Sequence, residues 1–298
     1  MQRLRMVGLC LVAAFALSIV AAGPAFAKTA SNIWEKFNEC PVGITPPEGE
    51  IQCVYGEAGR ESFFQAGKVT VHFVKPVKLN IGSAEDAETG ITGQFLVYAA
   101  QDGHTISKEA EPAPSLTEGI NTEKLSEAEK KSYEEYLAAG KSTKITATIE
   151  LALPAKDIYL NKANLIDEEG EAFGFPVMIH LTNKFLGTKC YVGSTAEPIV
   201  VPFTTGATNP EPPNTSIHGT KGPLIFRENF EIGEFSHTVL VNNEYAAPGV
   251  NGCGVNGSLD AAIDSALGLP SPAGSNTTML IGKLYQAGAS NVAAHIQY

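Results

Sequence analysis

Four cysteines have the spacing and the context for disulfide chemistry. The chain has five cysteines, and the first, Cys10, lies in the apolar N-terminal segment discussed below. The others are Cys40, Cys53, Cys190 and Cys253. An even number of cysteines in an oxidising compartment indicates disulfides, and four cysteines allow three pairings. The segment between Cys40 and Cys53 is rich in proline and glycine, which bring its ends together, so we favour Cys40–Cys53 with Cys190–Cys253.

Metal and cofactor chemistry is not indicated by the spacing of the possible ligands. The chain contains no C-x-x-C and no H-E-x-x-H motif, and none of its histidines pair at two- or four-residue spacing. Residues 167–171 concentrate carboxylates beside Gly170 but lack the alternation of calcium-binding loops, so we interpret them as a solvated turn. We therefore expect no cofactor and no metal. The widely separated histidines are His72, His104, His180, His218, His237 and His295.

Catalytic motifs are also incomplete. Gly140-Lys141-Ser142 matches the end of a phosphate-binding loop, but the glycine needed five positions earlier is Glu135, and a predicted helix precedes the motif. We interpret Gly140 as the end of that helix. The chain lacks the G-x-S-x-G motif of α/β hydrolases, and the paired carboxylates of glycosidases cannot be recognised from sequence spacing. The catalytic residues, if there are any, stay unknown at this level.

Residues 1–27 have the features of a cleavable secretory signal peptide. Arg3 and Arg5 precede an apolar run over residues 6–22, and small residues lead to a cleavage site after Ala27. The same apolar run lies at the short limit for an uncleaved membrane anchor. Gly23-Pro24, which interrupt a helix after the apolar run, and the small residues that follow them favour cleavage. With no second long apolar run, we expect an extracellular, secreted product with no transmembrane segment.

The net charge narrows the classes of partner. The formal charge is −11, and it becomes −13 when Arg3 and Arg5 are removed with the signal peptide. Binding of nucleic acids and of anionic membranes depends on clustered lysine and arginine, and the sequence has no such cluster. We therefore expect no nucleic-acid partner.

The elements that position these residues are mostly strands. About ten short segments show alternating or continuous apolar patterns between turn residues. This pattern predicts a mainly β fold, an antiparallel β-sandwich of immunoglobulin-like or jelly-roll-like type with one or two short helices and two disulfides. The expected strands are residues 68–74, 77–81, 94–100, 144–151, 175–182, 199–203, 224–227, 238–241, 279–287 and 292–296.

Two segments have helical patterns. A capping box at Ser126 opens a helix that ends at Gly140 and lies across a sheet or the end of the sandwich, and a second helix is expected over about 258–267. Residues 204–223 are rich in proline and glycine and predict a long loop, which could divide two domains. Because the favoured Cys190–Cys253 bridge spans this loop, we expect one secreted domain over 28–298.

Six short motifs are spread along the chain after residue 27: residues 37–41 (FNECP), 53–56 (CVYG), 183–193 (NKFLGTKCYVG), 251–254 (NGCG), 268–271 (GLPS) and 287–290 (AGAS). They resemble an uncharacterised family of secreted actinobacterial proteins, and the four cysteines lie within them. That family has no assigned function. The resemblance therefore implies secretion and disulfides, and it implies no catalytic residue. Residues 116–140 are an insertion relative to the family pattern.

These features favour one function over another. A disulfide-linked β framework without a recognisable reactive motif predicts a non-catalytic extracellular or cell-envelope binding or structural module. The alternative is a secreted hydrolase whose carboxylates or histidines meet only in three dimensions. The sequence leaves the partner unknown, and a cell-envelope component or a protein would fit.

Overall fold

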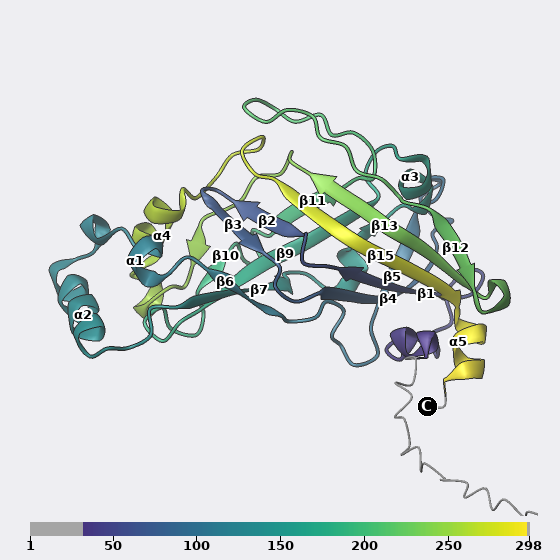
Figure 1. Ribbon diagram of the computed structural model, residues 1–298, viewed down its shortest axis with the longest axis horizontal. Helices are drawn as coiled ribbons and strands as arrows, with labels where there is room; N and C mark the ends of the chain where they lie inside the picture. The colour runs from purple at the N-terminus through teal and green to yellow at the C-terminus, as the bar shows by residue number, and fades with distance from the viewer. Residues whose placement is uncertain (1–31, 297–298) are drawn as a thin grey trace, which may run out of the picture. The chain divides into compact units, whose positions relative to one another are not determined.

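The computed structural model describes residues 32–296, so the expected signal peptide and its cleavage site lie outside the described residues. Of the described residues, 34–296 belong to one compact unit. Within this unit the protein is mainly β, with two antiparallel sheets whose apolar faces meet (Figure 1). The fold class predicted from the alternating pattern is confirmed.

The first sheet has eight strands, and its central strand was not expected from the sequence. β1 pairs with both β15 and β4, although Gly56 and Glu57 interrupt its apolar pattern. The strands in order are β12 (Leu224–Arg227), β13 (Ile232–Asn242), β15 (Thr278–Gly288), β1 (Gln52–Ala58), β4 (Val77–Glu85) and β5 (Phe95–Ala99), with β2 (Phe63–Ala66) pairing with β15 and with β3 (Val69–His72).

The second sheet has seven strands arranged around β9. The inward residues of β9 are buried, and its outward residues include Met178 and His180, which are only partly buried. This alternation is the period of two that places one face of a strand in the core. The strands in order are β14 (Val250–Asn251), β10 (Tyr191–Val192), β9 (Phe173–Thr182), β7 (Ile145–Leu151) and β6 (Ala110–Ala113), with β11 (Ile199–Phe203) and β8 (Tyr159–Leu160) also pairing with β9.

Both disulfides have the pairing favoured from the sequence. Cys40–Cys53 joins the segment before the first sheet to β1, and Cys190–Cys253 joins residues 63 positions apart beside β10 and β14. All four cysteines are buried. They therefore act as structural crosslinks, and not as exposed thiols.

The helices are short and lie outside the sheets. Among residues 32–296 no helix is long and apolar enough to cross a membrane. The α-helices are α1 (Leu116–Gly119), α2 (Glu127–Ala138), α3 (Lys162–Asp167), α4 (Asp260–Leu267) and α5 (Ala289–His295). The 3-10 helices are η1 (Ile33–Phe37), η2 (Thr122–Lys124), η3 (Ala155–Asp157), η4 (Glu228–Phe230) and η5 (Val255–Gly257).

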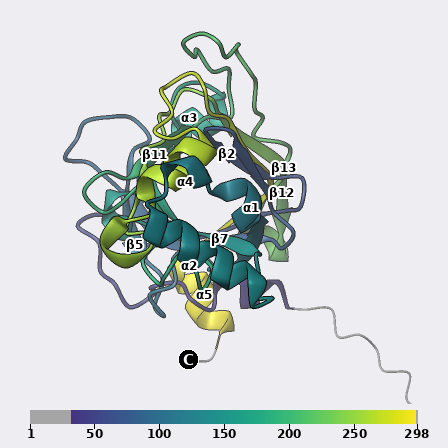
Figure 2. The ribbon, with the colours of Figure 1, turned by 90° about the vertical axis from the view of Figure 1, so that its left-hand side faces the viewer.

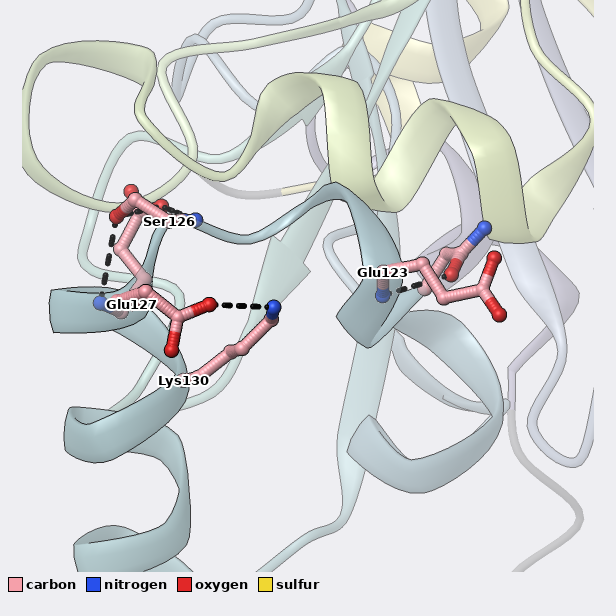
Figure 3. A network of polar contacts seen from close by, with 6 residues as sticks. Glu123, Ser126, Glu127 and Lys130 are labelled. Carbon is pink, nitrogen blue, oxygen red and sulfur yellow. Dashed lines mark hydrogen bonds and ion pairs between the residues drawn. The ribbon is translucent and has the colours of Figure 1, made fainter.

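The expected helix after Ser126 is α2, and it lies with α1 and α4 at one end of the sheets (Figures 1 and 2). Ser126 Oγ accepts a hydrogen bond from the Glu129 amide, and Glu129 Oε2 accepts one from the Ser126 amide at 2.8 Å, which is the predicted capping box. On its solvent side Lys130 pairs with Glu127 at 2.8 Å (Figure 3). Tyr133 of the same helix is buried.

Two further expectations concern the C-terminal third. Residues 204–223 form the expected long loop, which three isolated bridges tie down, for example Thr204 to Val241. The expected strand over residues 292–296 is wrong, because Ala289–His295 is the helix α5. Its apolar residues are spaced closely enough to fit either period, and Val292 is buried in a helical turn.

Candidate functional site

Between the two sheets lies a cavity of about 100 Å³ that is partly open to solvent, which we call the main cavity. One wall contains Gly56, Ala58 and Gly282, and Ala58 pairs directly with Gly282 across β1 and β15. The opposite wall contains Phe173 and Phe175 of β9. The two glycines are closely packed: a Cβ atom at Gly56 would lie 3.1 Å from Leu284 Cδ2, and one at Gly282 would clash with the Glu57 carbonyl oxygen.

The wall of the main cavity is almost entirely apolar. Its polar lining residues include Lys78 and Lys283, which are exposed and so hold their ammonium groups at the surface; the others are Glu57 and Thr238. An apolar concavity with few polar groups is typical of sites for hydrophobic molecules. The remaining apolar lining residues are Phe64, Phe73, Val77, Leu79, Ile106, Ile149, Val177, Val201, Phe203, Leu240, Leu280 and Leu284.

Smaller cavities share walls with the main cavity. One has a volume of about 40 Å³ and shares Phe64 with it. Another, which we call the lysine cavity, has a volume of about 50 Å³ and shares Phe173 and Leu284 with it. The main cavity and the lysine cavity therefore adjoin at these two side chains. The lysine cavity is lined by Val54, Leu160, Lys162, Leu165, Ile166, Phe173, Phe235, Leu284, Tyr285 and Gln286.

Lys162 places an amine in this apolar surrounding. It is the first residue of α3, where the preceding Asn161 caps the helix by accepting a hydrogen bond from the Asn164 amide. The backbone amide of Lys162 donates to the Gly93 carbonyl at 2.8 Å. Its Nζ lies 4.0 Å from the centroid of the Phe95 ring. Desolvation by burial lowers the pKa of Lys162 to about 7, because the charged form loses hydration without gaining a counter-ion.

Buried polar atoms without a hydrogen-bond partner are rare in proteins and mark places where a ligand or water belongs. Four such side-chain atoms occur among residues 32–296: Gln94 Oε1, Lys162 Nζ, His180 Nε2 and Asn243 Oδ1. Lys162 lines the lysine cavity, whereas Gln94, His180 and Asn243 line neither this cavity nor the main cavity. A molecule in the lysine cavity can therefore reach an amine that has no hydrogen-bond partner.

Among the six histidines, His180 has the contacts that most resemble part of a hydrolytic site. Its Nδ1 is 3.5 Å from Glu150 Oε1, and its ring stacks on Tyr191 with centroids 4.4 Å apart. None of the six histidines, all within residues 32–296, lines the main cavity or the lysine cavity. Two others pair with carboxylates at the surface: His104 with Asp102 at 3.2 Å and His295 with Glu231 at 3.8 Å.

The acidic run and the glycine of the phosphate-loop look-alike have structural roles. Glu168 ends α3 in a left-handed conformation, and its Oε1 accepts hydrogen bonds from the Lys221 amide at 2.9 Å and from Thr220 at 3.0 Å. Those backbone and side-chain hydrogen bonds lower the pKa of Glu168. Gly140 follows α2 with a φ of +64°, as a helix-ending glycine does. Within residues 32–296, no three His, Cys, Asp or Glu side chains are grouped as a metal ion requires.

An ion cluster centred on the buried Glu234 joins three strands of the first sheet. Glu234 of β13 pairs with Arg227 at 2.9 Å and with Lys283 at 3.1 Å. Burial opposes the ionisation of Glu234, but hydrogen bonds from Ser236, Arg227 and Lys283 lower its pKa. The cluster therefore links β12, β13 and β15 beside the main cavity. Its closed set of partners indicates a structural role.

Sequence reasoning missed both the main cavity and the role of Lys162. Gly56 and Gly282 lie within strands, but a strand glycine marks a close approach, as at Gly282 against the Glu57 carbonyl, and does not by itself indicate a cavity. For Lys162 there is no signal either, since a single lysine after an asparagine is an ordinary surface pattern.

Similarity to known proteins does not assign this site. The chain matches no family model, and no curated protein or solved structure is significantly similar to it. A function for the main cavity therefore has to be argued from its geometry and chemistry.

Proposed function

We propose that the protein is a secreted, non-catalytic module of the cell envelope that binds an apolar molecule in the main cavity. The observation that carries the proposal is a space of about 100 Å³ between two sheets, lined almost entirely by apolar side chains. An engineered apolar cavity of about 150 Å³ binds benzene, so this smaller space takes up the apolar end of a larger molecule. The rest of that molecule would extend through the open side of the main cavity.

The energetics of an empty cavity support binding. Protein interiors are packed as densely as organic crystals, and unfilled volume costs about 24 cal/mol per Å³. An apolar molecule that enters the main cavity gains van der Waals contacts with its wall and removes apolar surface from water, and both effects favour binding.

The covalent framework supports an extracellular setting. Two disulfides are consistent with an oxidising compartment. A signal peptide, as expected from residues 1–27, would deliver the protein there. Outside the cell, the apolar molecules at hand are the lipids of the envelope and their breakdown products.

A secreted hydrolase is the second candidate, and it rests on the 3.5 Å contact between Glu150 and His180. A carboxylate that orients an imidazole is part of many general-base sites. However, the Nε2 atom of His180, which would accept the proton, is buried, and Tyr191 stacks on the ring. Binding in the main cavity therefore accounts for more of the structure.

Filling the cavity tests the proposal. Ala58→Leu adds three carbon atoms at the wall of the main cavity, and Ala99→Leu makes the same change at an exposed position of β5. We expect 1-decanol to raise the Tm of the wild-type protein and of Ala99→Leu, and to have little effect on Ala58→Leu. No shift in the wild type, or equal shifts in all three proteins, would contradict the proposal.

The same proteins separate binding from hydrolysis. Incubation with p-nitrophenyl decanoate, followed by absorbance of the released phenol, reports turnover. We expect none above the buffer rate. Turnover that disappears in His180→Ala would favour the hydrolase instead.

A further inference from the structure

The lysine cavity contains an amine, and a purely apolar molecule offers no hydrogen-bond acceptor to it. The Nζ atom of Lys162 has no hydrogen-bond partner and lies 4.0 Å from the centroid of the Phe95 ring. The lysine cavity adjoins the main cavity at Phe173 and Leu284. An amine at one end of an apolar space is the arrangement that a molecule with one acidic end and one apolar end would fill.

The elements packed around Lys162 supply no counter-ion. The other lining residues, all within the described range, include no carboxylate, and the sole other titratable group among them is Tyr285, whose pKa is raised by burial. The neutral Gln286 is the remaining polar residue. From β5, Phe95 and the neighbouring Gln94 are uncharged. The apolar surroundings come from β1, β8, β9, β13 and α3 through Val54, Leu160, Phe173, Phe235, Leu165 and Ile166.

We propose that Lys162 binds the carboxylate of a medium-chain fatty acid whose hydrocarbon chain extends into the main cavity; this inference rests on the proposed function. A carboxylate supplies both the negative charge and the acceptors that the ammonium group lacks, and such charge-assisted hydrogen bonds are the strong ones. They are stronger still in a surrounding of low dielectric constant.

The two cavities hold only part of such an acid. Their volumes of about 100 Å³ and about 50 Å³ together match an engineered cavity of about 150 Å³ that binds benzene. They therefore take up the carboxylate and the nearest methylene groups, and the rest of a medium-length chain extends through the open side of the main cavity.

The pH dependence of binding follows from the protonation of the amine. The free amine has a pKa of about 7, whereas pairing with a carboxylate keeps it protonated to higher pH. Binding therefore takes up a proton above about pH 7, and the affinity for decanoate should fall about tenfold per pH unit between pH 7 and pH 9. It should also fall below about pH 5, where the fatty acid itself becomes protonated.

Calorimetric titrations of the purified, oxidised protein with decanoate and with 1-decanol test the inference. Simple partitioning favours the more apolar decanol, so a preference for decanoate requires the amine. At pH 7 we expect decanoate to bind about tenfold more tightly than decanol. Lys162→Met should abolish the preference and the pH dependence while still binding decanol, which also shows that the variant is folded. Lys131→Met, at an exposed position of α2, should behave as the wild type.

Lys162→Arg provides a second variant in case methionine disturbs the cavity. Because the guanidinium group stays charged, this variant should prefer decanoate at pH 9 as strongly as at pH 7. Equal affinities of the wild type for decanoate and decanol at pH 7 would overturn the carboxylate inference and leave the proposed function standing. Failure of the wild type to bind either compound would overturn both.

Discussion

The ammonium group of Lys162 would stay protonated in an unfolded chain up to its ordinary pKa of 10.5, whereas burial lowers that pKa to about 7 in the folded protein. Between these values the unfolded state binds more protons than the folded state. The free energy of unfolding therefore rises with pH over this window, and it has no dependence on this group below about pH 7. The free energy of unfolding increases with pH because folding disfavours the charged form of this base.

Replacing Lys162 tests this coupling. Lys162→Met has no ionisable group at this position, so its stability lacks this pH dependence. The difference in the free energy of unfolding between wild type and variant should therefore change by up to about 1.4 kcal/mol per pH unit between pH 7 and pH 9. Urea unfolding at pH 7, 8 and 9 measures it. Lys131→Met serves as the control, and parallel pH profiles for wild type and Lys162→Met would contradict the expected pKa.

At the scale of elements, α2 is a short helix whose start is determined locally. Its capping box satisfies amides that would otherwise have no partner at the helix N-terminus. Tyr133 and Tyr136 then hold it against the protein, with ring centroids 5.4 Å and 5.2 Å from that of Phe185. The sequence predicted the capping box, because its interactions lie within one helical turn, whereas the contacts with Phe185 depend on the tertiary structure.

Removing the cap should weaken α2. We expect Ser126→Ala to lower the free energy of unfolding by about 1 kcal/mol and to speed hydrogen exchange in the first turn of α2. Ser132→Ala is the matched control, since Ser132 is exposed within the same helix and alanine has the higher helix propensity there. Equal effects of the two substitutions would show that the cap contributes little.

The two disulfides act between elements, and their loops differ in length. The pairs are separated by 13 and 63 residues, so the longer loop restricts the unfolded chain more. We expect the double variant Cys190→Ala/Cys253→Ala to lose about 4 kcal/mol of unfolding free energy and Cys40→Ala/Cys53→Ala about 3 kcal/mol. Guanidinium unfolding would measure both, and the reverse order would mean that native-state strain outweighs loop length.

At the scale of the whole molecule, the main cavity couples stability to binding. Ala58→Leu fills space between the sheets and should raise the free energy of unfolding by about 1 kcal/mol, as cavity-filling substitutions do. Ala99→Leu at the exposed position should change it by less than about 0.5 kcal/mol. Thermal unfolding without added decanol measures this; a large loss in Ala58→Leu would mean that the cavity has no room for the leucine side chain.

The parts of the fold that sequence reasoning reached are those with local causes. Alternating residues predicted β7, and the strand boundaries of β12 match the expected range. β1 was missed because Gly56 and Glu57 break its pattern, and its position comes from pairing with β15 and β4 on both sides. α5 was expected as a strand because a short apolar run fits either period.

The amino-acid sequence by itself determined the β-rich class, the capped helix α2, the long loop and, through a turn-rich segment, the favoured disulfide pairing. Each depends on neighbours in the chain or on residue types alone. Only the tertiary structure decided where apolar space remains and which amine faces it. Residues of both sheets line the main cavity, among them Ala58 of β1 and Phe173 of β9, and the low pKa of Lys162 arises from surroundings contributed by distant strands. Packing volume and desolvation are sums over such distant contacts, and a linear pattern does not contain them.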